Sequence, residues 1–520
     1  MNLRVDYNQK ILIVDFGSQV TQLIARRIRE LSVYCEIISF QNFNKLKKLD
    51  NIKGIILSGG AASTSEIRSP NIKNFTLLKN IPILAICYGH QLISKIYGGK
   101  VKVSKRKEFG RAEIYFKKNS PITKNFFTNK KNTVWMSHSD QVSKLGKGFD
   151  VVAYTKNSNC AITHNLDKKI FTVQFHPEVI HTNKGIVIFK NFIFDICKCK
   201  KNWTNSRKLK KIIYEIKNKV RNQKVLCALS GGVDSSVLAH ILYKAIKNNV
   251  FCVYIDTGFM RKNESNEIIS IYKKKFKKNF IYLERSALFL KNLKNISDPE
   301  KKRKVIGATF IKIFENFSKR FKKIKFLAQG TLYPDVIESQ TFSGSPTSKI
   351  KSHHNVGGLP KKINFTLLEP FREMFKDEVR VLGKKIKVSS SILNRHPFPG
   401  PGLAIRILGC VDKTKIKILQ DADNIFINEL KNKHIYERIW QAFAVLLPIK
   451  TVGVMGDSRT YDFVCALRAV TSVDGMTADF YNFTSSDLSE ISSKLVNEVR
   501  GINRVVYDVT SKPPGTIEWE

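Results

Sequence analysis

Ser230-Gly231-Gly232-Val233-Asp234-Ser235-Ser236 is the stretch of sequence that best indicates how this chain folds. The apolar run from Val225 to Leu229 precedes it and has the length of a buried parallel strand, and the apolar spacing from Val237 to Ile246 predicts a helix after it. The stretch is therefore expected in a turn between a strand and a helix. In such a turn the glycines let the backbone approach a ligand, and the amides that open the helix can hold phosphate oxygens.

The polar side chains of this turn predict a phosphate site. Three serine hydroxyls add hydrogen-bond donors, and Asp234 is a candidate Mg²⁺ ligand. A Walker A loop would end in Lys followed by Ser or Thr, and no lysine closes this turn, so a grip on departing pyrophosphate fits better than a kinase-like grip. Ser-Gly-Gly alone is as often a plain turn as it is a phosphate-binding turn. The full stretch after a buried strand resembles the ATP pyrophosphatase family, which transfers AMP to a substrate oxygen. The resemblance assigns to ATP the residues Ser230, Gly231, Gly232, Val233, Asp234, Ser235 and Ser236.

Further candidate ligands follow in the same region. The strand expected at Phe251 to Ile255 ends at Asp256, and an acidic residue at the carboxyl end of a parallel strand commonly meets a ribose or adenine edge. Asp256 is therefore a candidate ATP ligand. A later strand leads to Asp335 and Glu338, which are candidate Mg²⁺ and substrate ligands. Residues 341–360 are rich in Ser, Gly and His, and we expect a lid there that shields a reactive intermediate from water.

Strands expected at 10–16, from 35 onward, at 52–58 and at 81–86 alternate with helices, which predicts a parallel sheet covered on both faces. Cys87 follows the fourth strand on a tight turn into a helix, where the positive end of the helix dipole favours a thiolate. This is the cysteine counterpart of the nucleophile elbow. Downstream, a strand runs into His176-Pro177-Glu178. Residues two apart in an extended chain point the same way, so Glu178 can orient His176 while His176 serves the thiolate.

The patterns C-x-G-x-Q at 87–91 and H-P-E at 176–178 together resemble the class I glutamine amidotransferases. The resemblance implies that Cys87 attacks the glutamine amide, that His176 carries the proton that expels ammonia, and that Glu178 supports His176. It also implies an oxyanion hole made by Gly59, Gly60 and the amide of Tyr88. The implied glutamine pocket is lined by Gln91, Ser137, His138 and Asp140. We expect His90 to be a solvent-facing helix residue.

The length and composition of the chain limit the number of domains and the class of protein that it can be. A chain of 520 residues predicts about three domains, and we place them at 1–200, 201–395 and 396–520. The first boundary lies in a charged segment at 198–211, and the second precedes a rigid Pro- and Gly-rich connector at 396–403. The apolar runs are too short for a membrane span, and the nine cysteines include no C-x-x-C pair. We therefore expect a cytoplasmic protein with neither a disulfide framework nor a zinc site.

The formal net charge of +46 favours polyanion binding at first sight. However, the lysines are spread along the chain, and no RNA-binding signature accompanies them. We interpret the charge as compositional bias, and we expect no specific nucleic-acid partner.

Residues 395–403, 456–461 and 512–520, with the order of domains, resemble the glutamine-hydrolysing GMP synthases over essentially the whole chain. That family aminates xanthosine monophosphate (XMP) to GMP with ATP, Mg²⁺ and glutamine. The resemblance implies an α/β fold with a flavodoxin-like amidotransferase domain, a Rossmann-like ATP pyrophosphatase domain and a small α+β C-terminal domain that forms a homodimer. The implied XMP ligands are Arg303, Gln441, Arg504, Lys512, Ile517 and Glu518. We expect a helix from Glu437 to Leu447, a strand from Thr451 to Met455 and a docked C-terminal tail. A C-terminal module used only for assembly is the alternative.

Three other functions share some of these features. A tRNA-thiolating pyrophosphatase would account for the basic charge, but it normally needs further catalytic cysteines and has no use for the amidotransferase motifs. An NAD synthase shares both chemistries but usually carries a nitrilase-type Glu-Lys-Cys set, which is not found. A polyanion-binding scaffold would tolerate the loss of Cys87 and Asp234, and both are present with their partners.

Overall fold

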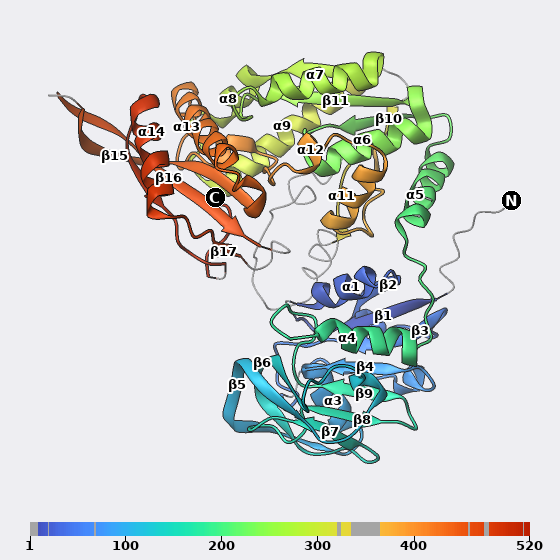
Figure 1. Cartoon of the computed structure of the whole chain (residues 1–520). Coiled ribbons are helices and arrows are strands. Elements are labelled where there is room, and N and C mark those ends of the chain that lie inside the picture. The colour runs from blue at the N-terminus through green and yellow to red at the C-terminus, as the bar shows by residue number, and fades with distance from the viewer. Residues whose placement is uncertain are drawn as a thin grey trace. The chain divides into compact units, whose positions relative to one another are not determined.

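The computed structural model describes residues 9–18, 20–66, 69–319, 324–333, 365–455, 458–472, 478–512 and 514–520, without the side chains at 105, 106 and 455. The chain forms two compact units, Met1–Lys211 and Ile212–Glu520 (Figure 1). The expected ligands Asp335 and Glu338 and the expected lid at 341–360 lie outside the described residues. The division into three domains stays a prediction.

The first unit is built on a nine-stranded sheet in the order β2-β1-β3-β4-β9-β8-β7-β5-β6. The strands from β2 to β9 in this order are parallel, and each later strand is antiparallel to its neighbour. The strands are β1 (Lys10–Asp15), β2 (Cys35–Ser39), β3 (Ile52–Leu57), β4 (Ile83–Ile86), β5 (Lys100–Phe116), β6 (Lys131–Lys144), β7 (Asp150–Tyr154), β8 (Ile162–Asn165) and β9 (Ile170–Val173). The helices are α1 (Thr21–Glu30), α2 (Phe40–Phe43), α3 (Tyr88–Ile96) and α4 (Gly185–Lys190). Because parallel strands end at one edge, the segments that follow β3, β4 and β9 meet there.

The second unit begins with a parallel five-stranded sheet in the order β12-β11-β10-β13-β14. Its strands are β10 (Lys224–Ala228), β11 (Val250–Asp256), β12 (Phe280–Glu284), β13 (Ile324–Ala328) and β14 (Thr366–Leu368). The accompanying helices are α5 (Asn205–Val220), which contains the boundary between the units, α6 (Val233–Ile246), α7 (Glu264–Phe276), α8 (Ser286–Leu293), α9 (Pro299–Lys319), α11 (Lys376–Lys385) and α12 (Ser390–Leu393). The strand predicted before the Ser230–Ser236 turn is β10, and the predicted helix is α6, which starts at Val233 within that stretch rather than at Val237.

A second, smaller sheet completes this unit. It contains β15 (Gln441–Met455), β16 (Ser458–Thr471), β17 (Asp479–Phe480) and β18 (Ile502–Tyr507), with helices α13 (Lys413–Asn432) and α14 (Ser485–Glu498). β15 lies at the edge and pairs with β16 in antiparallel register. One apolar core joins both sheets, because buried side chains from Leu226 and Phe259 through Leu403 to Ala442 and Leu467 form a single cluster. The two sheets therefore share a core within one unit.

The helix predicted from Glu437 to Leu447 was wrong, because strand β15 starts at Gln441. Ala442, Ala444 and Leu446 face one apolar cluster, and Phe443 and Val445 face another. With both faces buried, the sequence shows a continuous apolar run rather than the alternation that marks a strand, so its period cannot separate strand from helix. The strand predicted at Thr451 to Met455 is confirmed as the end of β15.

The α/β class is confirmed by the parallel strands of the two larger sheets and the helices that accompany them. The described helices include none that is both long and apolar enough to cross a membrane.

Candidate active sites

Cys87 occupies a strained turn between β4 and α3. Its backbone has φ 50° and ψ −102°, a region that costs a residue with a side chain about 1–3 kcal/mol and is often found at functional sites. The Cys87 amide donates to the carbonyl of Val173 on β9 at 2.8 Å. Two residues on, a Cβ at Gly89 would lie 2.7 Å from the carbonyl oxygen of Leu57, so only glycine lets α3 approach β3 this closely. The elbow predicted at Cys87 is thus present.

His176 and Glu178 complete a cluster around the thiol. His176 Nδ1 lies 2.7 Å from Glu178 Oε1, and the Glu178 side chain is fully buried. Burial lowers the pKa of His176, but the charges of Glu178 and Cys87 and hydrogen bonds to both raise it, and the net result is a pKa well above the ordinary value. A protonated imidazole next to a sulfur nucleophile is the arrangement that cysteine-based acyl transfer needs.

Two glycines lie against this cluster. A Cβ at Gly59 would lie 3.2 Å from His176 Cε1 and 3.7 Å from Cys87 Cβ, and a Cβ at Gly60 would lie 3.2 Å from Tyr88 Cγ. The Tyr88 backbone opens α3 directly after the nucleophile. The structure therefore brings together the three residues expected to form the oxyanion hole, and that role stays a prediction.

The four residues expected to bind glutamine also gather around the thiol. The Cys87 thiol donates to the carbonyl of Ser137 at 3.8 Å. Gln91 Nε2 donates to the carbonyl of Asp140 at 2.8 Å, and His138 Nδ1 lies 3.0 Å from the same oxygen. The carboxylate of Asp140 accepts a short hydrogen bond from Ser63. Apart from the bond that the Cys87 thiol donates to Ser137, these contacts order the pocket wall without using the Cys87–His176 pair.

Sequence reasoning missed two residues of this site. Glu108 Oε2 lies 3.0 Å from His138 Nε2, and Thr155 donates to Glu108 Oε1 at 2.8 Å, all of them buried. Burial raises the pKa of Glu108, but His138 and Thr155 lower it, and the net direction is down. The second missed residue, Gln174, donates to the Cys87 sulfur at 3.8 Å. Glu108 pairs with His138 across β5 and β6 after an irregularity in register, and no local spacing signals that pairing.

The expectation that His90 faces solvent was wrong. Every residue from Tyr88 to Ser94 is buried, so this part of α3 has no solvent face. His90 Nδ1 lies 2.6 Å from Thr172 Oγ1, and burial lowers the pKa of His90 to about 3. The residue is therefore a neutral core histidine behind the elbow.

The second candidate site is the turn between β10 and α6. Gly231 has φ +78°, and a Cβ there would lie 2.2 Å from Ile268 Cδ1, so the turn requires glycine. The Ser230 and Ser235 hydroxyls lie 3.0 Å apart, and Ser236 Oγ donates to the carbonyl of Gly232 at 2.5 Å. These bonds hold the serines around the open end of α6.

Two carboxylates accompany this turn. Asp234 lies in the first turn of α6, with Lys376 Nζ 3.8 Å from its Oδ2. Asp256 ends the neighbouring strand β11 and accepts a hydrogen bond from the Gly258 amide at 2.9 Å. The described residues expected to bind ATP thus share one edge of the parallel sheet, and binding itself stays a prediction.

A third cluster joins the C-terminal tail to β15. Glu518 accepts from Gln441 Nε2 at 2.6 Å and from Arg406 at 2.8 and 3.1 Å, and Arg406 is fully buried. Arg303 donates to the carbonyl of Glu520, whose carboxylate lies 2.6 Å from Lys302 Nζ. The expectation of a docked tail is confirmed by these contacts.

The remaining expected XMP ligands are less closely grouped. Ile517 is buried against Phe443 in a small apolar cluster, and the Lys512 backbone bridges to Ala478. Arg504 is exposed on β18, and among the described residues no contact joins it to the other five. The structure therefore brings Arg303 and Gln441 into contact with the tail, which itself carries Glu518, but it leaves Arg504 apart.

Three family models match this chain in succession. The class I glutamine amidotransferase model matches residues 12–196, the NAD synthase model matches 205–303, and the GMP synthase C-terminal domain model matches 428–519. The curated GMP synthase (glutamine-hydrolyzing) of Sinorhizobium fredii is 50% identical over 98% of this chain and 98% of its own length. The protein of the same name from Agrobacterium fabrum is 51% identical over 99% of this chain and 100% of its own length. At this identity and coverage, the chain belongs to the family of glutamine-hydrolysing GMP synthases.

Proposed function

We propose that this chain aminates XMP to GMP, using ammonia released from glutamine and the cleavage of ATP to AMP and pyrophosphate. The observation that carries the proposal is the presence in one chain of the Cys87–His176–Glu178 cluster and the Ser230–Ser236 turn. Relatives named for this activity match the chain almost end to end. One site would supply ammonia and the other would activate its acceptor.

The glutaminase half follows from the first cluster. The Cys87 sulfur attacks the carboxamide carbon of glutamine, and the amide nitrogen leaves as ammonia with a proton from His176. Water then hydrolyses the thioester to glutamate, with His176 taking the proton of the water. The amides of Gly59 or Gly60 and of Tyr88 are proposed to bind the developing oxyanion, and each such donor is worth about 3 kcal/mol in comparable sites.

The synthetase half needs an activated carbonyl, because a ring oxygen is a poor leaving group. The XMP oxygen attacks the α-phosphorus of ATP, the bond to the β-phosphate oxygen breaks, and pyrophosphate departs into the Ser230–Ser236 turn. Ammonia then adds to the activated ring carbon, a proton is lost, and AMP leaves with the oxygen. The amides at the start of α6 favour the departing anion.

Magnesium fits this turn as a partner of the phosphates. Asp234 offers a hard carboxylate oxygen in the first turn of α6, and Mg²⁺ is usually held by one or two carboxylates together with substrate phosphates. When bound there, Mg²⁺ would neutralise the charge on pyrophosphate. The assignment of Asp335 and Glu338 as further ligands lies outside the described residues.

The tail cluster is the proposed XMP site. Glu518 is positioned by Arg406 and Gln441, so that its carboxylate can accept from the N–H groups of the purine edge. Arg303 and Lys512 are proposed to meet the phosphate. Arg504 belongs to the proposal through the family resemblance only.

We also propose a homodimer formed through the second sheet. The long β15–β16 hairpin carries apolar side chains that are largely exposed in the single chain, with Val454 at 72%, Tyr461 at 63% and Ile449 at 56%. Such a patch favours burial against a second copy. A cytoplasmic location is proposed as well, because all nine cysteines are described and each is free.

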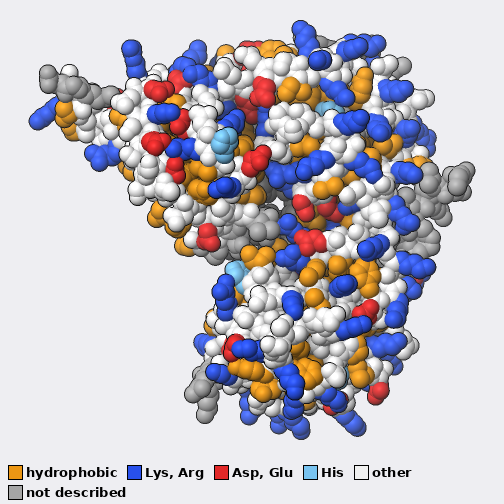
Figure 2. Space-filling model, viewed as in Figure 1, with side chains coloured by type: hydrophobic (Ala, Val, Ile, Leu, Met, Phe, Trp, Pro, Cys, Tyr) orange, Lys and Arg blue, Asp and Glu red, His pale blue; other side chains and the backbone are white. Residues whose placement is uncertain are grey.

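The basic charge is the feature on which a nucleic-acid-binding function would depend. Figure 2 shows Lys and Arg side chains spread over the visible face rather than gathered in one stripe, which is the distribution expected of a composition effect. NAD synthase is the rival that a comparison favours, through residues 205–303.

Pyrophosphate release separates these two functions. The full chain would be given MgATP and ammonium with either XMP or deamido-NAD. We expect pyrophosphate release in the reaction that contains XMP and none in the reaction that contains deamido-NAD. Release with deamido-NAD and none with XMP would assign the chain to the rival reaction.

A further inference from the structure

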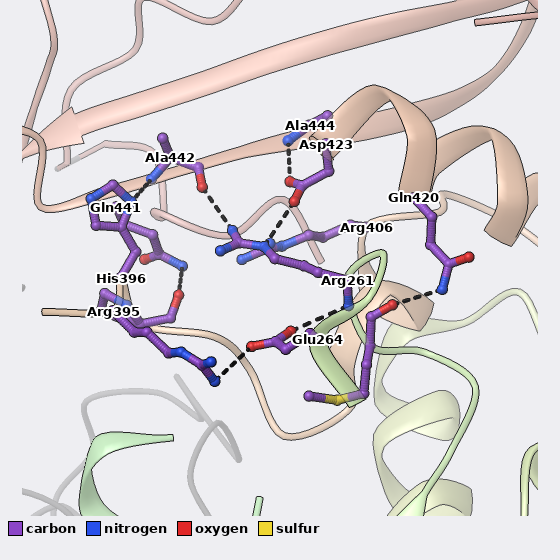
Figure 3. Close-up of polar contacts among 12 residues, drawn as sticks. Arg261, Glu264, Arg395, His396, Arg406, Gln420, Asp423, Gln441, Ala442 and Ala444 are labelled. Carbon is purple, nitrogen blue, oxygen red and sulfur yellow. Dashed lines mark hydrogen bonds and ion pairs between the residues drawn. The ribbon is translucent and has the colours of Figure 1, made fainter. Parts of the chain in front are cut away.

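A buried ion pair connects the two sheets of the second unit. Arg261 lies between β11 and α7, and its Nε is 2.8 Å from Oδ2 of Asp423 on α13 (Figure 3). The Asp423 side chain is fully buried, and that of Arg261 is 15% exposed. Burial lowers the pKa of Arg261, but the carboxylates of Asp423 and Glu264 raise it, and the net direction is up. The Arg261 guanidinium therefore keeps its charge in the interior.

Both partners also bond to the backbone of β15. Arg261 Nη2 donates to the carbonyl of Ala442 at 3.0 Å, and Asp423 Oδ1 accepts from the amide of Ala444 at 3.1 Å. The Ala442 amide donates to His396 Nδ1 at 3.2 Å. β15 is an edge strand, and these are the outward groups that no neighbouring strand can satisfy. Figure 3 shows these side chains converging on the start of the strand.

The clamped strand leads directly into the proposed XMP site. Gln441 precedes Ala442, and its amide nitrogen lies 2.6 Å from Glu518 Oε1. A shift of Ala442 would therefore move Gln441 and the carboxylate it orients. The ion pair reaches the site through the backbone of β15, and the charge of Arg261 also interacts electrostatically with Glu518.

The opposite end of the same network reaches the ATP turn. The Arg261 amide donates to Glu264 Oε2 at 3.3 Å, and Glu264 Oε1 lies 3.3 Å from Arg395 Nη1. Arg395 Nη1 in turn donates to the carbonyl of Gly231 at 3.4 Å. A continuous set of polar contacts thus runs from the phosphate turn to the start of β15.

We propose that Arg261 and Asp423 are positioning residues that hold the purine-recognising end of β15 in register with the ATP turn. The inference rests on the proposed function, because transfer of AMP requires the XMP oxygen and the α-phosphorus to meet in line at about 3–3.5 Å. Misplacement of about 1 Å can cost about a hundredfold in rate. A clamp that fixes one site relative to the other prevents such a shift.

A neighbouring ion pair provides a matched control. Lys262 Nζ lies 2.8 Å from Asp421 Oδ1, so this pair joins the same loop to the same helix. Its side chains are 40% and 25% exposed, and neither has a described bond to β15. If holding the loop to α13 were the only role, the two pairs would be equivalent. The contacts to Ala442 and Ala444 are what distinguish Arg261 and Asp423.

The test compares D423N, R261Q and R261K with K262Q in the full chain. Ammonia-dependent pyrophosphate release gives kcat and the KM of XMP and of ATP, the melting temperature reports folding, and glutaminase activity checks that the other unit is unchanged. We expect kcat/KM for XMP to fall about tenfold or more in D423N and R261Q, with the KM of ATP changed less than threefold. R261K keeps the charge and should lose less, and K262Q should match the wild type.

The outcomes separate this inference from the proposed function. A wild-type chain that releases no pyrophosphate with XMP would refute both. An active wild type with unchanged XMP parameters in folded R261Q and R261K would refute the positioning role alone. An equal loss in K262Q, or a loss confined to the KM of ATP, would refute it as well.

Discussion

His176 Nδ1 lies 2.7 Å from the Glu178 carboxylate, although a single proline separates the two residues in the chain. The Glu178 side chain is fully buried, and its backbone carbonyl accepts from Arg27 Nε at 2.9 Å, so the carboxylate is held in place. With Nδ1 bound to Glu178, the other ring nitrogen is left to serve Cys87. Orientation of the imidazole therefore depends on one carboxylate, and its protonation depends on that carboxylate together with Cys87.

The variant E178Q should slow glutamine hydrolysis by about 10²–10⁴-fold, the usual contribution of a positioned acid or base. Glu178 raises the pKa of His176 against the effect of burial, so its loss should move the basic limb of the pH profile of kcat/KM to lower pH. The measurement is glutamate release between pH 6 and 10. An unchanged profile would show that Glu178 does not set the charge of His176.

The variant C87A should abolish GMP formation from glutamine while leaving formation from high ammonium intact. The reason is that only the glutamine amide requires a thiol nucleophile. GMP formation with each nitrogen source is the measurement. Equal loss of both activities would contradict separate sites for ammonia production and ammonia use.

Glu108 provides a test of the pocket wall. The variant E108Q removes the carboxylate from His138 Nε2, and loss of a buried charge-assisted hydrogen bond should raise the KM for glutamine about tenfold or more. The matched control is E113Q, because Glu113 lies on the same strand but is exposed and pairs with Lys131 at 3.3 Å. A KM that changes equally in both variants would refute a specific role for Glu108.

Much of the amidotransferase site could be predicted from the sequence because its chemistry is local. His176 and Glu178 lie in one short segment, and Cys87 lies at the junction of a strand and a helix. Glu108 could not be found in this way, because it meets His138 only through the register of two long strands.

The incorrect predictions share a physical cause. β15 was assigned to a helix, and His90 was assigned to the surface, because both segments are buried on more than one side. Periodicity reports a boundary between core and solvent, so it fails where no such boundary exists. The tail contacts of Glu518 with Arg406 and Gln441 likewise depend on tertiary packing that no local pattern encodes.

His90 should make the stability of the first unit depend on pH. The pKa of His90 is lowered to about 3 in the folded chain, and the unfolded value is near 6.5, so between these values only the unfolded state binds the proton. The stabilising contribution is complete above pH 6.5 and is lost as pH falls toward 3, by about 1.4 kcal/mol per pH unit.

Hydrogen exchange of the α3 amides measures this dependence. Comparison of the wild type with H90Q at pH 7 and pH 5 should give a smaller pH dependence in the variant. H181Q, at an exposed position of the same unit, should behave as the wild type. Identical dependence in H90Q and the wild type would contradict the buried neutral state.

Asp234 provides the test of the phosphate turn. The variant D234N should lose pyrophosphate release with glutamine and with ammonium alike, because AMP transfer precedes the use of either nitrogen source. Glutaminase activity should survive, since the thiol site lies in the other unit. Retained GMP synthesis in D234N would mean that ATP binds elsewhere.

The most direct test of the central claim is the identity of the nucleotide products. The purified chain is given XMP, MgATP and glutamine, and the products are separated and quantified. The account predicts GMP, AMP and pyrophosphate in equal amounts, with no consumption of ATP when XMP is omitted. ADP and orthophosphate as products, or ATP consumption that is indifferent to XMP, would contradict it.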